Sequence, residues 1–300
     1  MTSGTNTSDF GSSKRENHDS SYFYASKLYT EIEPASSKPS NGFENKLPPS
    51  LLNKIVVGDS RDLSKIPDIS IHLVVTSPPY NSRKQYDDDL SLSEYLSLIE
   101  DVFRELYDKI VDGGRVCINI ANMGRKPYVP LSDYISQIMM NLGYIQRGEV
   151  IWDKAASAGS STAWGSWQSS TNPILRDVHE YILIFSKGTM KRVKAGKTDT
   201  ISKDEFLEYT KSIWQFQTES AKKIGHPAPF PVELPYRCIQ LLSLKDDVVF
   251  DPFMGSGTTA IAAMETYRNY LGFDLNEKYV ELANDRVDQW HLMKEHADKF

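Results

Sequence analysis

The residues best suited to chemistry stand together at 77–80, where a hydroxyl, two prolines and an aromatic ring follow the apolar run Ile71–Thr76. The β-branched residues of this run favour a buried strand, whereas Pro78 lacks an N–H and cannot continue a hydrogen-bonded ladder. Carbonyl groups in such a turn need donors other than a neighbouring strand, and the exocyclic amine of a nucleobase is one. The ring of Tyr80 offers a face on which a base could stack. An ordinary strand end with a Ser-Pro-Pro turn is the alternative interpretation.

A second stretch, Asp251–Ala260, has the composition of a nucleotide-binding turn. It follows the apolar run Val248–Phe250 and opens a helical pattern, and Gly255 and Gly257 permit a tight turn with close approach of a ligand. Seventeen residues after Gly257, Asp274 ends the next apolar run, where a carboxylate can accept hydrogen bonds from ribose hydroxyls. The order of strand, glycine turn, helix, strand and acid predicts a site for a nucleoside-bearing cofactor.

Two cofactors fit this glycine turn. The spacing Gly255-x-Gly257-x-x-Ala260 also satisfies the pattern of NAD-binding domains, which would make the protein an oxidoreductase. S-adenosylmethionine is favoured by the first motif, because a Ser-Pro-Pro-Tyr turn has an evident use in methylating an amine and none in hydride transfer. No metal is expected, since the six histidines are scattered without ligand spacing.

Seven apolar runs, alternating mostly with helical patterns, must position these motifs. Strands are predicted over 54–59, 71–76, 115–120, 144–152, 180–185, 247–250 and 270–273, and helices over 91–110, 131–142, 230–244, 257–266 and 276–296. This alternation predicts an α/β fold with a doubly wound, mostly parallel, seven-stranded sheet.

Together the two motifs resemble those of the DNA amino-methyltransferases, over nearly everything from Lys54 to Asp288. The catalytic motif precedes the cofactor motif, and this circular order is that of the beta class. Protein-glutamine and many RNA amino-methyltransferases place the same motif after the glycine turn. The resemblance implies a circularly permuted S-adenosylmethionine-dependent methyltransferase fold with an inserted target-recognition region. It also implies methyl transfer to a base flipped out of double-stranded DNA.

The resemblance assigns roles to particular residues. The catalytic turn comprises Ser77, Pro78, Pro79 and Tyr80, in which the Ser77 hydroxyl and Pro78 carbonyl accept the amine hydrogens, Pro79 keeps the turn rigid and Tyr80 stacks on the base. The cofactor is assigned to Asp251, Phe253, Gly255, Ser256, Gly257, Thr258 and Thr259 in the glycine turn, to Asp274 at the ribose, to Asp59 at the adenine, and to His226 and Phe230 at the methionine end.

The base that accepts the methyl group is predicted from Ser77. In this family a serine before Pro-Pro-Tyr is associated mainly with N4 of cytosine and an aspartate mainly with N6 of adenine, so cytosine is favoured and adenine is the alternative. Overall similarity further suggests the restriction–modification methylases that protect the palindrome CCCGGG. Methylation of cytosine C5 is set aside, because it needs a cysteine nucleophile, and neither Cys117 nor Cys238 follows a proline.

DNA contacts are expected in polar segments outside the regular elements. Aromatic, amide and guanidinium side chains predicted to read base edges are Trp164, Trp167, Gln168, Asn172 and Arg176, while Lys191, Arg192, Lys194 and Lys197 are predicted to hold phosphates. Arg83 and Lys84 follow the catalytic turn and are predicted to contact DNA near the flipped base. Ordinary solvated loops are the alternative for all of these segments.

Composition and charge set the frame for these predictions. The 300 residues are 40% hydrophobic and 25% charged, which is typical of a folded protein, and two cysteines suit a reducing cytoplasm. A net charge of −6 conceals a basic middle, with eleven Lys and Arg against eight Asp and Glu between residues 151 and 225.

Double-stranded DNA is the expected partner, together with functional pairing, without a stable complex, to a restriction endonuclease; no membrane is expected. The predicted organisation is a mobile polar tail (1–46) and a methyltransferase domain (47–300), divided into a catalytic half (47–154 and 177–186), a target-recognition region (about 155–176 and 187–222) and a cofactor half (223–300).

Overall fold

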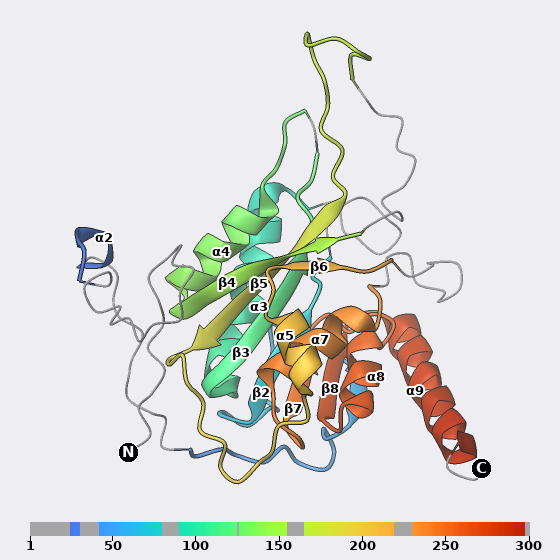
Figure 1. Cartoon of the computed structure of the whole chain (residues 1–300). Coiled ribbons are helices and arrows are strands. Elements are labelled where there is room, and N and C mark those ends of the chain that lie inside the picture. The colour runs from blue at the N-terminus through green and yellow to red at the C-terminus, as the bar shows by residue number, and fades with distance from the viewer. Residues whose placement is uncertain are drawn as a thin grey trace.

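A single mixed sheet runs through the computed structural model, which describes residues 25–30, 42–79, 90–124, 126–154, 165–218 and 230–297. Its eight strands lie in the order β1-β8-β7-β2-β3-β5-β4-β6 (Figure 1). Their bounds are β1 Lys54–Val57, β2 Ile71–Thr76, β3 Ile110–Ile120, β4 Tyr144–Asp153, β5 His179–Lys187, β6 Ile213–Gln215, β7 Val248–Asp251 and β8 Asn269–Asp274.

Only β5 runs against its neighbours, so the predicted, mostly parallel sheet is confirmed. The eighth strand, β6, was not predicted. It is three residues long, pairs with β4 at the edge of the sheet, and buries Trp214 completely. Three residues are too few for an alternating pattern to stand out from the surrounding sequence.

Helices cover both faces of this sheet (Figure 1). The helices are α2 Lys27–Thr30, α3 Leu92–Lys109, α4 Leu131–Asn141, α5 Lys203–Tyr209, α7 Glu233–Leu242, α8 Thr258–Glu265 and α9 Glu277–Ala297. In β2, Val74 packs into the hydrophobic cluster that contains α3 and α4, while Leu73 and Val75 pack into the cluster that contains α7, α8 and α9. Among the described residues, no helix combines the length and apolar character that crossing a membrane requires.

Helix α3 ends close to its predicted boundary, and the strand that follows it begins earlier than predicted. Ser91 caps the helix, with its side chain accepting from the Glu94 N–H and its own N–H donating to the Glu94 carboxylate. The predicted strand 115–120 begins too late, because Ile110 already adopts extended backbone and pairs with Ile71 as the start of β3. Gly113 has a φ of +71°, and a side chain there would meet the Lys191 carbonyl oxygen at 2.8 Å.

The N-terminal boundary also differs from the prediction. Residues 42–46, expected in a mobile tail, lie against the sheet, where the Asn45 N–H donates to the Ile69 carbonyl at 2.8 Å. Leu47, the next residue, is buried in the core. The rest of the predicted tail lies outside the described residues, apart from 25–30, which include the short helix α2.

Candidate active site

The catalytic turn and the glycine turn meet through one carboxylate. Asp251 ends β7 and is fully buried, and its two oxygens accept hydrogen bonds from the Thr76 and Thr259 hydroxyls, each at 2.6 Å. The Phe253 N–H donates to the same carboxylate at 3.0 Å. Because β7 and β2 are neighbouring parallel strands, their carboxyl ends bring Asp251 beside Thr76, the residue before the catalytic turn.

Burial and hydrogen bonding act on this carboxylate in opposite directions. Burial raises the pKa of Asp251 to about 6, although hydrogen bonds from Thr259, Thr76 and the Phe253 N–H partly offset that effect. The carboxylate thus connects both turns, and its pKa of about 6 lies near neutral pH.

Backbone conformation at the glycine turn requires residues without side chains. Gly257 has a φ of +81°, and a Cβ there would lie 2.9 Å from the Cβ of Ala283 on α9. Gly255 has a φ of +51°. From α9, Arg286 donates to the Ser256 hydroxyl at 2.9 Å, so a long-range contact holds the turn. The sequence gives no sign of this contact, because Arg286 has the setting of any helix-surface arginine.

Two acidic residues flank the glycine turn at the carboxyl edge of β8 and β1. The Asp274 carboxylate accepts from the Gly255 N–H at 2.9 Å and the Asn276 N–H at 2.8 Å, and burial raises its pKa. The next strand brings Asp59 nearby, since the Gly58 N–H donates to the Asp274 carbonyl at 3.0 Å. Hydrogen bonds from Arg61 hold the pKa of Asp59 below its usual value. The predicted ribose and adenine acids are therefore neighbours.

The catalytic turn has a polar neighbourhood that the sequence interpretation missed. Pro78 is buried, while Ser77 and Pro79 are half-buried. Behind Ser77 lies Asn119 of β3, whose side chain also contacts Glu180 of β5. Asn119 and Glu180 are buried polar residues within otherwise apolar strands. A polar residue at such a position in the sequence could have indicated a functional role.

The sequence also matches a known family. A model of the DNA methylases, of the N6/N4 type, matches residues 71–285, which include both turns. The chain belongs to this DNA methylase family. Among its relatives, the type II methyltransferase M.MjaI of Methanocaldococcus jannaschii is 28% identical over 279 residues, covering 78% of this chain and 91% of its own. The type II methyltransferase M.SmaI of Serratia marcescens is 26% identical over 273 residues, covering 78% and 90%.

Solved structures agree with this assignment of the methylase. TTHA0409 of Thermus thermophilus, a chain assigned to the DNA modification methylases, has 31% identity and a TM-score of 0.63, covering 78% of this chain and 94% of its own. Its complex with S-adenosyl-L-methionine gives 30% identity, coverage of 79% and 95%, and a TM-score of 0.63. The cytosine-N4-specific PvuII DNA methyltransferase shares the fold at 23% identity, with coverage of 77% and 84% and a TM-score of 0.63. The predicted beta-class family and methyltransferase fold are confirmed.

Other predicted residues of the methylase fall in different places. Phe253 and Phe230 are half-buried and pack against the two hydrophobic clusters. Tyr80, Arg83, Lys84, Trp164 and His226 lie outside the described residues. Cys117 and Cys238 are buried in the core, which agrees with setting aside a cysteine nucleophile.

A loop between β4 and β5 carries four of the predicted base-reading residues. It is the yellow-green projection at the top of Figure 1, and it leaves the sheet at the carboxyl end of β4, the edge that carries the catalytic turn. Hydrogen bonds from the Ser166 N–H to the Asn172 carbonyl and from the Asn172 N–H back to the Ser166 hydroxyl shape its tip. Trp167 is 64% exposed there, and Gln168, Asn172 and Arg176 are exposed as well.

The predicted phosphate-binding role of Arg192 and Lys197 is wrong. Arg192 is only 5% exposed and donates to Asp247 and Glu44, and Lys197 contacts the same two carboxylates at 2.9 Å. His72 completes this buried ion cluster, with its Nε2 3.0 Å from Glu44. Burial alone would raise the pKa of Glu44, but hydrogen bonds from His72, Lys197 and Arg192 outweigh it and hold that pKa well below its usual value.

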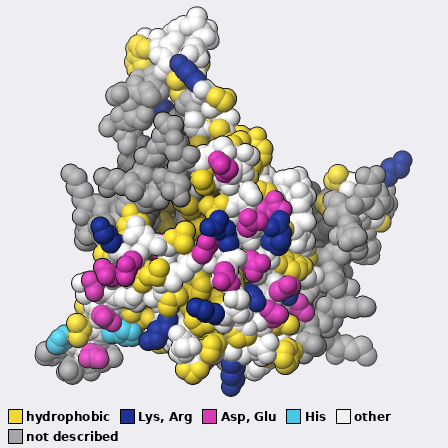
Figure 2. Space-filling model, turned by 180° about the vertical axis from the view of Figure 1, so that it is seen from behind, with side chains coloured by type: hydrophobic (Ala, Val, Ile, Leu, Met, Phe, Trp, Pro, Cys, Tyr) yellow, Lys and Arg dark blue, Asp and Glu magenta, His cyan; other side chains and the backbone are white. Residues whose placement is uncertain are grey.

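The position of the basic segment, residues 191–197, also argues against a DNA contact beside the catalytic turn. It follows the end of β5, and Gly113 at the start of β3 lies against it, so it occupies the amino edge of the parallel strands. Lys194 is exposed but pairs with Asp199, and Lys191 is exposed. On the face shown in Figure 2, the described Lys and Arg side chains are interspersed with Asp and Glu rather than gathered in a cationic surface.

Replacing Arg192 with methionine should therefore affect stability and leave DNA binding unchanged. The change leaves the fully buried Asp247 without its bidentate partner, and we expect a loss of about 3 kcal/mol in the free energy of unfolding. Chemical denaturation measures this loss, with Lys194→Met as the exposed control, expected within about 0.5 kcal/mol of the parent. A lower salt dependence of DNA binding in Arg192→Met would restore the phosphate-contact interpretation.

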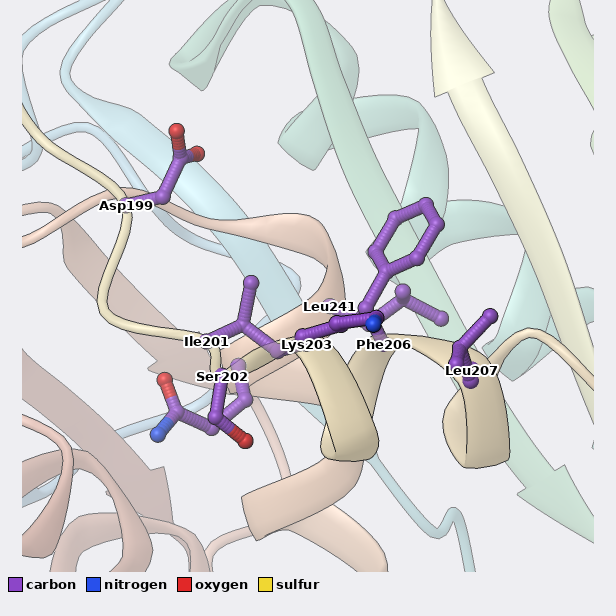
Figure 3. A pocket seen from close by; sticks show the side chains of 8 residues that line it. Asp199, Ile201, Ser202, Lys203, Phe206, Leu207 and Leu241 are labelled. Atoms are coloured by element: carbon purple, nitrogen blue, oxygen red, sulfur yellow. The ribbon is translucent and has the colours of Figure 1, made fainter.

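A pocket of about 370 Å³ between α5 and α7 is separate from this site (Figure 3). Ile201, Phe206 and Leu241 contribute its apolar lining, and Ser202 and Gln240 contribute polar groups. None of its lining residues belongs to either turn. The pocket therefore lies outside the candidate active site at the carboxyl edge of the sheet.

Proposed function

We propose that the methylase transfers a methyl group from S-adenosylmethionine to N4 of a cytosine flipped out of double-stranded DNA. The observation that carries this proposal is the buried bridge Thr76–Asp251–Thr259, which joins the glycine turn to the catalytic turn on neighbouring strands. Such a bridge holds two bound reactants side by side, and positioning of that kind can supply much of the catalysis in a transfer between them.

Residues at the carboxyl edge fit S-adenosylmethionine by their chemistry. Asp274 would accept hydrogen bonds from the ribose hydroxyls beside the Gly255–Gly257 turn, and Asp59 would accept one from the adenine amine. Phe253 and Phe230 offer apolar surface, and Ser256, Thr258 and Thr259 lie in the same turn, while His226 is assigned to the methionine end. When bound, S-adenosylmethionine supplies a methyl group on a positively charged sulfur, which an amine nitrogen can attack.

The catalytic turn would hold the target amine. The amine of cytosine is a poor nucleophile, because its lone pair is delocalised into the ring. The Ser77 hydroxyl and the Pro78 carbonyl would accept its hydrogens in a non-planar arrangement that favours a localised lone pair. Tyr80 would stack on the flipped base, and Pro79 would keep the turn rigid. Flipping costs a few kcal/mol, which these contacts would offset.

The recognition and biological role follow from the same proposal. Trp167, Gln168, Asn172 and Arg176 project from the carboxyl edge, where they could read base edges together with Trp164, and Arg83 and Lys84 would contact DNA beside the flipped base. Relatives called type II methyltransferases support a role in protecting cytoplasmic DNA from a separate restriction endonuclease. CCCGGG stays the predicted target sequence.

Methylation of defined DNA tests the function and the base together. The purified chain is incubated with S-adenosylmethionine and CCCGGG duplexes, and the nucleosides are then identified by mass spectrometry. We expect N4-methylcytosine. N6-methyladenine, formed on duplexes of mixed sequence, would replace cytosine by adenine as the target, and absence of any methylated base on genomic DNA would contradict the proposed function.

A further inference from the structure

A chain of polar contacts runs behind the catalytic turn from Lys154 to Ser77. Lys154 forms an ion pair with Glu180, and the other Glu180 oxygen accepts from the Asn119 side-chain nitrogen at 2.6 Å. The same nitrogen lies 3.5 Å from the Ser77 hydroxyl oxygen. Asn119 and Glu180 are 2% and 7% exposed, so the middle of this series of contacts is buried, while Lys154 and Ser77 at its ends are half-buried.

Charge on Glu180 fixes the direction of the hydrogen bonds in this chain. Paired with Lys154, Glu180 is a carboxylate and can only accept, so the atom of Asn119 that faces it must be the nitrogen. The same nitrogen also donates to the Ser77 oxygen. The hydroxyl hydrogen of Ser77 therefore cannot point back along that contact.

We propose that Lys154, Glu180 and Asn119 are positioning residues that make Ser77 a hydrogen-bond donor to the flipped base. Its acceptor would be the ring nitrogen beside the target amine, N3 of cytosine, with the Pro78 carbonyl left to accept from the amine. This inference rests on the proposed function and changes one hydrogen bond within it. A donor aimed at the ring nitrogen fixes the rotation of the base in its own plane, and so sets the line along which the amine meets the methyl group.

The neutral, equally sized variant Glu180→Gln should reverse this direction. Lys154 would donate to the glutamine oxygen, which turns the glutamine nitrogen towards Asn119 and makes the Asn119 amide rotate. The Asn119 oxygen would then face Ser77, and the hydroxyl hydrogen would be drawn away from the base. A residue that served only to fill space would not produce this reversal. Glu149→Gln, an exposed position on β4, is the matched control.

The experiment compares duplexes that carry cytosine or 3-deazacytosine at the target position, since the analogue keeps the amine and lacks the N3 acceptor. For the wild-type chain and Glu149→Gln, we expect the analogue to lower kcat/KM by about ten-fold or more. For Ser77→Ala and Glu180→Gln, the loss caused by the analogue should be much smaller, because the hydrogen bond is already absent. Comparing variants on the same two duplexes cancels the effects of the analogue on base pairing and on the amine itself.

Three results separate the possible outcomes. If the wild type fails to methylate the cytosine duplex, the proposed function is at fault; should the product be N6-methyladenine, the same comparison is made with adenine and 1-deazaadenine. Equal sensitivity to the analogue in wild type and Ser77→Ala would overturn the inference. Unchanged binding of S-adenosylmethionine, measured by calorimetry, shows that each variant is folded. If folded Glu180→Gln loses as much kcat/KM on 3-deazacytosine as the wild type does, the positioning role of Glu180 is contradicted.

Discussion

Replacing Asp251 with alanine is expected to lower the free energy of unfolding by about 3 kcal/mol or more. The change leaves three donors, the buried Thr76 and Thr259 hydroxyls and the half-buried Phe253 N–H, without their shared acceptor. Binding of S-adenosylmethionine should weaken at the same time, since the glycine turn loses the carboxylate that connects it to Thr76 of β2. Urea denaturation and calorimetry measure the two effects, and Asp285→Ala, an exposed site on α9, is the control, expected within about 0.5 kcal/mol of the parent.

The pH dependence of the same position gives an independent check. The folded-state pKa of Asp251, about 6, lies above the roughly 3.9 of an unfolded chain, so the proton is bound more tightly in the folded state. The stabilisation linked to this proton is fully present below about pH 4 and is lost as the pH rises through about 6. Asp251→Asn cannot titrate, so the stability of wild type relative to this variant should fall by about 2–3 kcal/mol between pH 4 and pH 7. A difference independent of pH would contradict the raised pKa.

The parts of this site that could be predicted from sequence are those that lie within one motif. Glycines at 255 and 257, the acid at 274 and the turn after β2 are each defined by neighbours in the chain, and their strands have the uniform apolar character of a sheet covered on both faces. The permuted order of the motifs then pointed to the family.

What could not be predicted depends on contacts between distant segments. Arg192 looked available to phosphate because nothing near it in the sequence reveals Glu44 or Asp247, which lie 148 and 55 positions away. Asn119 and Glu180 stand 61 positions apart, and only pairing of β3 with β5 brings them behind the catalytic turn. Local patterns set elements and motifs, whereas the partner of a buried charge is decided by the topology of the sheet.

Replacing Ser77 with alanine should lower kcat for methylation by about 10²–10³-fold, the loss seen when one well-placed hydrogen-bonding group is removed from a reacting centre. Ser77 is half-buried at the end of β2, and alanine fits its turn, so the fold and the affinity for S-adenosylmethionine should be retained. Single-turnover methylation measures the chemical step, and Ser64→Ala, an exposed serine outside the site, is the control. If the single-turnover rate of Ser77→Ala is within about two-fold of the parent rate, the Ser77 hydroxyl has no role in the chemical step. The hydroxyl would then neither accept from the amine nor donate to the ring nitrogen beside it, and the choice between cytosine and adenine could no longer be attributed to the residue before Pro-Pro-Tyr.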